Sequence, residues 1–393
     1  MKALDKLDAS LPLSDTERMV LDSVRQVVRD VIAPNAQAFD ETGSFPWANV
    51  EALNALGLNG IFIPEAYGGA GLSYTAYLAC VREISQACAS TGIIWATNFH
   101  AMGPLVEFGT EEQKARLLPR IAAGGLASLA ITESHAGSDA TGMKTRFTPD
   151  GDDILISGSK TFITSGDVAD LYLLFGKWSE IENAKDAISV LILEKGDPNL
   201  KVLGLEKKMG LRASSTAALA FDNVRMPRAN LLGKPGDGLA ILLASLNRSR
   251  PSVAAHALGI ARAAFERTIA YVNERRQFGR RVIDNQGIQF MLADMATDLT
   301  LSESWLWQVA ALVDAGEQDF GIESSMLKMR ATDVTMRIAD NAVQLHGGYG
   351  YIREYEVERL MRDAKITQIW EGTNQIHRQL IGKSLARREG TNR

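Results

Sequence analysis

Apolar positions along the first third of the chain recur at helical spacing. Ser14 followed by Glu17 has the pattern of a capping box, in which each side chain bonds the backbone N–H of the other residue. Apolar residues then repeat with the helical period from Met19 to Val31. Further helices are predicted over residues 50–58, over 74–90 and from Thr110 onward.

The pattern changes to short apolar runs near residue 127. Glycine, aspartate and asparagine turns separate these runs, which have the composition of β-strands. They cover residues 128–132, 153–164, 171–175, 187–193 and 218–224. The helical period then returns, over 252–275, 286–314, 323–345 and 371–388.

Helices, strands and helices therefore follow one another in blocks, without alternation. This order argues against a doubly wound parallel sheet, and the chain contains neither a GxGxxG fingerprint nor a GxxxxGK[ST] loop. The sequence predicts three domains: a helical domain over residues 1–126, a β domain over 127–236 and a second helical domain over 237–393.

Composition excludes several classes of function. The 47 acidic residues outnumber the 42 basic ones, so the protein does not bind nucleic acid through bulk basic charge. Two cysteines and five scattered histidines exclude a disulfide scaffold and predict no metal site. No apolar run approaches the roughly 18 residues of a membrane span, and the N-terminus shows no targeting signal. We expect a cytoplasmic protein.

Three segments carry chemistry beyond their structural pattern. Residues 130–139 (AITESHAGSD) place backbone amides and the Ser138 hydroxyl where they form either an anion-binding nest or a plain capped turn. Residues 273–286 gather four arginines, which suit either a phosphate clamp or a solvated helix end. In residues 368–375, Glu371 is either a helix cap or a general base. None of the three is decisive alone.

Together, these segments and four others resemble the acyl-CoA dehydrogenase family of flavoproteins over nearly the whole chain. The matching stretches are ITESHAGSD (131–139), KTFITSG (160–166), KKMGLRASST (207–216), RSRPSVAAHALGIAR (248–262), ERRQFGR (274–280), QLHGGYGY (344–351) and IWEGTNQI (369–376). The resemblance implies a multidomain α+β fold with an N-terminal helical domain, a middle β-barrel-like domain and a C-terminal four-helix bundle. It also implies FAD between the β domain and the bundle, in a homotetramer.

The resemblance assigns cofactor contacts residue by residue. Those at the flavin and pyrophosphate are Thr132, Gly137, Ser138, Phe162, Ile163 and Thr164. Those offered to the adenine half of FAD in a neighbouring subunit are Arg275, Gln277, Phe278, Gln286, Gln344 and Gly348. Thr373 and Gln375 lie on the adenosine side.

Glu371 matches the catalytic base of the family. The resemblance implies that it removes the α-proton of an acyl-CoA thioester while flavin N5 accepts the β-hydride, which gives the trans-2-enoyl-CoA. Electrons then pass to an electron-transfer flavoprotein. The residues implied at the substrate are Ser138, Arg250, Trp370 and Gly372.

Some positions depart from the family pattern. Phe162 replaces a usual tryptophan. Trp370 replaces a usual tyrosine, and its larger ring favours short, branched or cyclic acyl groups. Ser249 stands where some branched-chain members carry an alternative glutamate base, which leaves Glu371 as the candidate. Two other interpretations stay open: a flavoenzyme of the same fold that acts as an oxidase, monooxygenase or desulfinase, and a non-catalytic CoA-binding protein.

Overall fold

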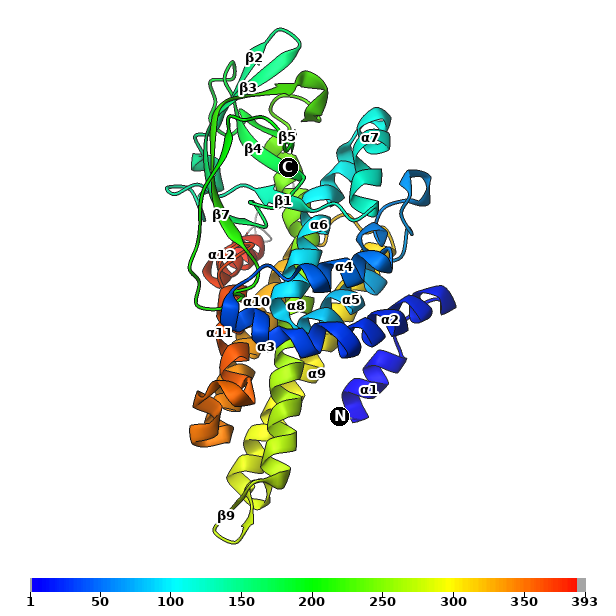
Figure 1. Ribbon diagram of the computed structural model, residues 1–393, viewed down its shortest axis with the longest axis vertical. Helices are drawn as coiled ribbons and strands as arrows, with labels where there is room; N and C mark the ends of the chain where they lie inside the picture. The colour runs from blue at the N-terminus through cyan, green and yellow to red at the C-terminus, as the bar shows by residue number, and fades with distance from the viewer. Residues whose placement is uncertain (1, 387–393) are drawn as a thin grey trace.

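The computed structural model describes residues 2–386 and has helices at one side, a sheet at one end and a long helical bundle along its length (Figure 1). The N-terminal helices are α1 (Lys2–Ala9), α2 (Asp15–Val27), α3 (Ala33–Thr42), α4 (Trp47–Ala55), α5 (Tyr74–Ala87), α6 (Ala89–Phe108) and α7 (Glu111–Ala122). The capping boxes at Ser14 and Thr110 are both formed, so the predicted starts of α2 and α7 are confirmed. The helix predicted over 74–90 is interrupted at Cys88, whose backbone is extended.

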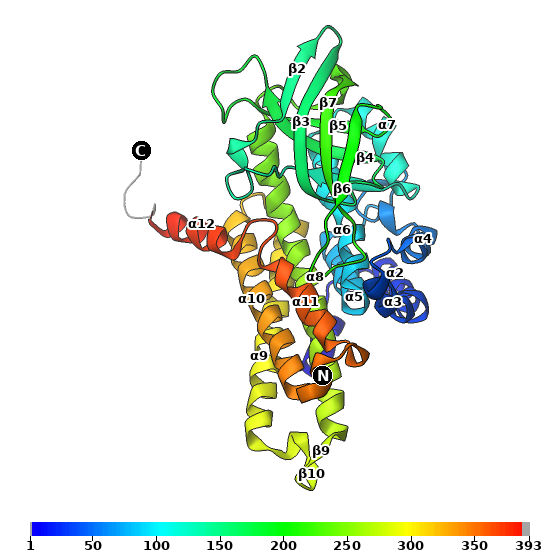
Figure 2. The ribbon, with the colours of Figure 1, turned by 60° about the vertical axis from the view of Figure 1, so that its left-hand side comes forward.

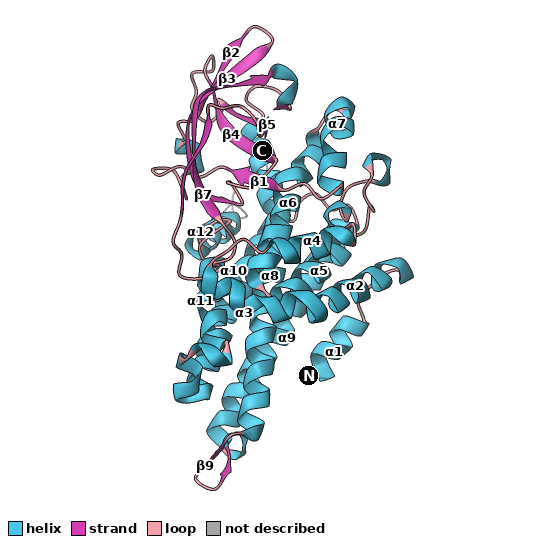
Figure 3. Cartoon of the chain, viewed as in Figure 1, coloured by secondary structure: helices cyan, strands magenta, loops and turns pink. Residues whose placement is uncertain are grey.

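One mixed sheet follows in the chain (Figure 3). Its strands are β1 (Ala127–Ala130), β2 (Arg146–Asp150), β3 (Asp153–Thr164), β4 (Leu171–Trp178), β5 (Ile188–Glu194), β6 (Leu200–Leu205), β7 (Thr216–Pro227) and β8 (Leu231–Leu232). The order is β6-β7-β3-β2-β4-β5-β8, and β1 lies parallel to β4. The sequence did not predict β2 or β6, because β2 contains a proline and two charges and the side chains of β6 are mostly exposed, so neither has a strand pattern.

The C-terminal helices are α8 (Gly238–Glu274), α9 (Gln286–Asp314), α10 (Gly321–His346), α11 (Val357–Thr367) and α12 (Asn374–Ala386). A two-stranded hairpin, β9 (Arg276–Gln277) and β10 (Arg280–Arg281), joins α8 to α9 at the end of the molecule opposite the sheet (Figure 2). The prediction over 286–314 matches α9, whereas α8 begins 14 residues earlier than expected because it runs through Pro251.

The last helix begins later than the sequence predicted. It starts at Asn374 rather than at residue 371, and the predicted end at residue 388 lies outside the described residues. No helix within residues 2–386 is long and apolar enough to cross a membrane.

A cluster of buried charges joins four helices below the sheet. Arg82 of α5 and Glu303 of α9 are fully buried and lie 3.2 Å apart. Arg262 of α8 donates two further hydrogen bonds of 2.7 Å to Glu303. Asp8 of α1 accepts from both arginines, at 2.7 and 2.8 Å. Each charge is costly to bury alone, so the cluster requires the four helices to pack in this arrangement.

We predict that Glu303→Gln lowers the free energy of unfolding by about 3–5 kcal/mol, because the two buried arginines lose the carboxylate that bridges them and keep only Asp8 and, at Arg82, Glu83. Chemical denaturation measures the change. Asp294→Asn, on the exposed face of the same helix, is the control and should change stability by less than about 0.5 kcal/mol. A Glu303→Gln variant as stable as the unmodified chain would contradict the proposed role of the cluster.

Candidate active site

A cavity of about 440 Å³ opens where the sheet meets α6, α8 and the loop between α11 and α12. Ten of the residues predicted to contact cofactor or substrate line it. They are Thr132, Gly137, Ser138, Phe162, Ile163, Thr164, Trp370, Glu371, Gly372 and Thr373. The structure therefore brings together segments that are more than 200 residues apart in the chain.

A β-bulge shapes the sheet side of this cavity. The pairing of β3 with β7 shifts register between Lys160 and Ile163, and Phe162 within the shift has a φ of 59°. A bulge interrupts the alternation of side chains between the two faces of a sheet. Here it leaves the Phe162 side chain turned outward, with 62% of the residue exposed. A non-glycine residue in the left-handed region is strained, so the surrounding contacts must hold it.

A buried ion pair holds the neighbouring loop against the bulge. Lys160 Nζ donates to Glu133 Oε1 at 2.7 Å and to the Ile131 carbonyl at 2.8 Å. Burial alone would raise the pKa of Glu133, but the Lys160 ammonium and two backbone N–H donors lower it to about 2. Burial lowers the pKa of Lys160, although Glu133 opposes the shift. The Thr161 N–H also donates to the Thr132 carbonyl at 2.9 Å, so the loop and the bulge form one unit.

Glu371 lies in the loop that joins α11 to α12, and its predicted place at a helix start is wrong. Its φ is 51° and that of Gly372 is 91°, so two successive residues adopt left-handed backbone. A Cβ at Gly372 would come within 3.2 Å of the His377 ring, which adds a steric reason for glycine. Ser249 Oγ of α8 donates to Glu371 Oε2 at 2.7 Å and orients the carboxylate.

A second buried lysine supports this loop from beneath. Lys328 Nζ of α10 donates to the Gly372 carbonyl at 2.7 Å and to Asn374 Oδ1 at 3.1 Å. Burial lowers the pKa of Lys328 to about 7. Asn374 in turn donates to Asp333 Oδ1 at 2.8 Å, so the start of α12 is tied to α10.

Arg250 lies behind the cavity and does not line it. Its guanidinium is buried and donates to Asn247 Oδ1 at 2.9 Å and to Ser325 Oγ at 3.3 Å. Arg250 therefore does not reach the cavity in this structure, and its contact with substrate stays a prediction.

The remaining predicted residues gather elsewhere on the same chain. A separate hollow of about 550 Å³ is lined by Arg275, Gln277, Gln344 and Gly348. These residues lie at or near the β9–β10 hairpin, which is at the far end of the bundle from the sheet (Figure 2). Arg275 stacks over the Tyr349 ring at 5.2 Å. Phe278 projects from the hairpin with 99% of its surface exposed, and Gln286 is the first residue of α9. One chain alone therefore does not bring this group to the Glu371 cavity. Gln375 lies beside that cavity in a hollow shared with Thr373.

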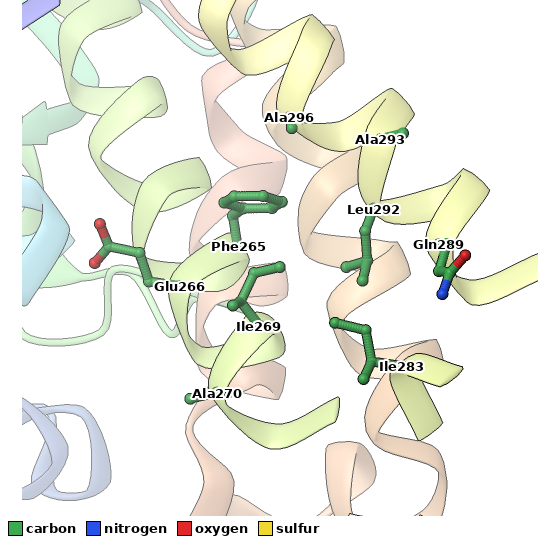
Figure 4. Close-up of a pocket in the computed structure, with 9 residues that line it drawn as sticks. All are labelled: Phe265, Glu266, Ile269, Ala270, Ile283, Gln289, Leu292, Ala293 and Ala296. Carbon is green, nitrogen blue, oxygen red and sulfur yellow. The ribbon is translucent and has the colours of Figure 1, made fainter. Parts of the chain in front are cut away.

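A larger hollow of about 610 Å³ between α8 and α9 offers little chemistry (Figure 4). Phe265, Ile269, Ile283 and Leu292 form most of its wall. None of the predicted site residues lines it, and its single acid, Glu266, accepts a hydrogen bond from Gln86.

Sequence reasoning missed the residues that support the site from behind. Lys160 and Lys328 gave no signal, because a lysine in a strand or helix is ordinarily exposed. Ser249 was noted only as the place of an alternative base, since its partner Glu371 is 122 residues away in the chain.

Comparison with known proteins identifies the family. Three family models match: the N-terminal domain of acyl-CoA dehydrogenase at residues 14–125, its middle domain at 128–224 and its C-terminal domain at 236–386. The chain belongs to the acyl-CoA dehydrogenase family. It is 43% identical to an acyl-CoA dehydrogenase of Bacillus subtilis, over 93% of this chain and 97% of that one.

Solved structures agree with this assignment. Butyryl-CoA dehydrogenase from Megasphaera elsdenii superposes with a TM-score of 0.93 and 35% identity, over 96% of this chain and all of that one. A glutaryl-CoA dehydrogenase from Mycobacterium smegmatis in complex with FADH2 superposes with a TM-score of 0.89 and 29% identity, over 97% of each chain. Members of this family are FAD-dependent oxidoreductases that act on a CH–CH group.

The residues around the cavity fit such a cofactor. Phe162 offers an exposed aromatic face, and Thr132, Ser138 and Thr164 offer hydroxyl groups on the same wall. A Cβ at Gly137 would meet no atom within 4 Å, so the backbone there is open to a bound group.

We predict that Glu133→Gln destabilises the protein by about 3 kcal/mol at pH 7, because Lys160 then remains buried without its carboxylate. The pKa of Glu133 is lowered in the fold, so its contribution is complete above its ordinary value of 4.5 and is lost as the pH falls towards 2. The stability difference between the two proteins should therefore shrink between pH 5 and pH 2 in thermal unfolding.

The control for this prediction is the double variant Glu133→Gln/Lys160→Met, which removes both charges together. It should lose less stability than Glu133→Gln alone. Equal losses, or a difference that does not depend on pH, would show that the ion pair does not hold the loop.

Proposed function

We propose that this protein dehydrogenates a short, branched or cyclic acyl-CoA between its α- and β-carbons, with Glu371 as the base. The observation that carries the proposal is the placement of the Glu371 carboxylate. It faces the cavity from a strained loop, held by Ser249, opposite the wall that contains Phe162 and Thr164.

Different residues of the chain remove the proton, stabilise the carbonyl oxygen and exclude water. A thioester α-proton is only weakly acidic, so a carboxylate must lie within reach of it while the carbonyl oxygen is stabilised. Glu371 takes this proton, and its own backbone N–H faces the thioester oxygen. Bound FAD supplies the acceptor for the β-hydride. Trp370 and the apolar side chains of Ile131 and Val253 keep water from the reacting carbons.

The limited cavity supports a small acyl group. Its roughly 440 Å³ is shared between substrate and cofactor, and Trp370 lies against the His256 ring at 5.6 Å. Trp370 is thus a bulky side chain packed against α8 at the cavity wall, which favours a short acyl group. The similarity to butyryl-CoA dehydrogenase of Megasphaera elsdenii favours the same size class.

Two partners complete the proposal. The hollow at Arg275, Gln344 and Gly348 serves the adenine half of FAD bound to a neighbouring subunit, within a homotetramer. Gln277, Phe278 and Gln286 belong to the same surface, and Thr373 and Gln375 serve the adenosine of the chain's own cofactor. The electrons leave through an electron-transfer flavoprotein.

We predict that Glu371→Gln retains FAD and acyl-CoA binding but lowers kcat at least a thousandfold, because the amide cannot accept the α-proton. Anaerobic mixing with butyryl-CoA tests this through loss of the oxidised flavin absorbance. Dehydrogenation by the variant at the normal rate would show that a residue other than Glu371 is the base. Rapid turnover of the unmodified enzyme with O₂ as sole acceptor would instead support the oxidase alternative.

We predict that Ser249→Ala lowers kcat by about tenfold to a hundredfold with little change in KM, because the carboxylate loses the hydroxyl that orients it. Ser249→Thr retains a hydroxyl and should recover most of the loss. The matched control is Ser245→Ala on the same helix, since Ser245 bonds the His100 carbonyl rather than Glu371. Equal kcat in Ser249→Ala and in the unmodified enzyme would exclude a positioning role.

A further inference from the structure

One face of α6 contributes one apolar and two polar side chains to the Glu371 cavity. Ile93, Thr97 and His100 are spaced four and three residues apart, so they share one side of the helix, and all three line the cavity. Each is only 4% exposed. Thr97 and His100 are thus nearly buried polar residues on the cavity wall.

The rest of this part of the cavity is apolar. Its other walls are formed mainly by side chains without hydrogen-bonding groups: Leu129, Ile131, Val253, Ile366 and Ile369. Trp370 lines it as well, and its indole N–H is sealed from the cavity and has no partner among the described residues. The remaining hydroxyls of the cavity, on Thr132, Ser138, Thr164 and Thr373, are those proposed for the cofactor. Thr97 and His100 have no role in that proposal.

A chain of hydrogen bonds determines which of these groups can donate. The Tyr77 hydroxyl donates to the Ala96 carbonyl at 3.3 Å and lies 2.9 Å from Ser252 Oγ. We assign the Tyr77 proton to the Ala96 carbonyl, so that Ser252 donates to Tyr77 and Ser252 Oγ accepts from His100 Nε2 at 3.0 Å. Burial lowers the pKa of His100, so the ring is neutral at pH 7. In this assignment the His100 Nδ1 carries no proton and is an acceptor.

Thr97 is an acceptor as well. Its hydroxyl donates to the Ile93 carbonyl at 2.7 Å, which leaves only oxygen lone pairs for the cavity. No described residue forms a hydrogen bond with His100 Nδ1. This atom is also not one of the buried polar atoms of the described residues that lack both a partner and access to solvent, so it is accessible from the cavity side. A second hollow that His100 lines measures about 10 Å³, which is room for no more than one water.

The two acceptors lie within reach of a substrate held at Glu371. Glu371 and His100 line the same cavity. An acyl group with its α-carbon at Glu371 has room to extend its distal carbons along the Ile93–Thr97–His100 face. A purely apolar group there would leave both acceptors without a partner.

We propose that the acyl group oxidised by this enzyme carries a hydrogen-bond donor, a hydroxyl or an amino group, on a carbon beyond the β-carbon, and that Thr97 and His100 accept from it. This inference rests on the proposed function. Sites that bond a polar substrate group reject the analogue that lacks it, so the substituent sets the specificity.

The test uses FAD-loaded Glu371→Gln protein, so that binding is measured without turnover, and four pentanoyl-CoA thioesters substituted at carbon 4. They carry a hydroxyl, an N-methylated ammonium, a keto or a methyl group, and a matching hexanoyl set carries the same groups at carbon 5. We expect the hydroxyl compound to bind at least tenfold more tightly than the methyl compound in calorimetry, and the keto compound to gain nothing. The unmodified enzyme should show the same order in kcat/KM.

Thr97→Val keeps the shape of the side chain and removes its acceptor, so it should reduce the preference at least threefold. His100→Phe should reduce it further, whereas Ile93→Val, on the same face, should leave the ratio unchanged. Equal binding of the hydroxyl, keto and methyl compounds at both positions, or an unchanged ratio in Thr97→Val, would overturn the inference while dehydrogenation stands. Normal turnover by Glu371→Gln would instead overturn the proposed function.

Discussion

Glu371 faces the cavity in a backbone conformation that its own residue type does not favour, and the rest of the site depends on that strain being held. Left-handed backbone at a non-glycine residue costs on the order of 1–3 kcal/mol, so neighbours must supply the restraint. Lys328 does so from α10 through the Gly372 carbonyl, and Ser249 does so from α8 through the carboxylate itself. A base held in this way needs little rearrangement before it meets a substrate.

The opposite wall uses the same device. Lys160 is buried in β3 and bonds the 131–133 loop through the Ile131 carbonyl and Glu133, while Phe162 leaves the strand at a bulge. Each wall thus has a strained residue facing the cavity and a buried lysine behind it that holds the neighbouring loop by a carbonyl. Burial makes both ammonium groups costly, so each loop must stay in place to bond them.

The buried charge cluster, which lies farther from the cavity, fixes the position of the helix that contributes to it. The buried charges of Arg82, Arg262 and Glu303 tie α5, α8 and α9 together, and α8 continues from there to Ser249 beside the cavity. A shift of α8 along its axis would separate Arg262 from Glu303 and Ser249 from Glu371 at the same time. The position of the base is therefore linked to the packing of the whole bundle.

The sequence by itself determined the features that depend on neighbouring residues: the capping box at Ser14, the helix start at Thr110, the span of α9, the block order of helices and strands, and the family motifs. Only the tertiary structure decided where α8 begins, that residue 371 lies outside a helix, and which buried groups support it. Helix caps and periodicity arise from contacts a few residues apart, so they can be predicted locally. The bonds from Ser249 and Lys328 to the 371–374 loop span at least 44 residues, and only the packed fold forms them.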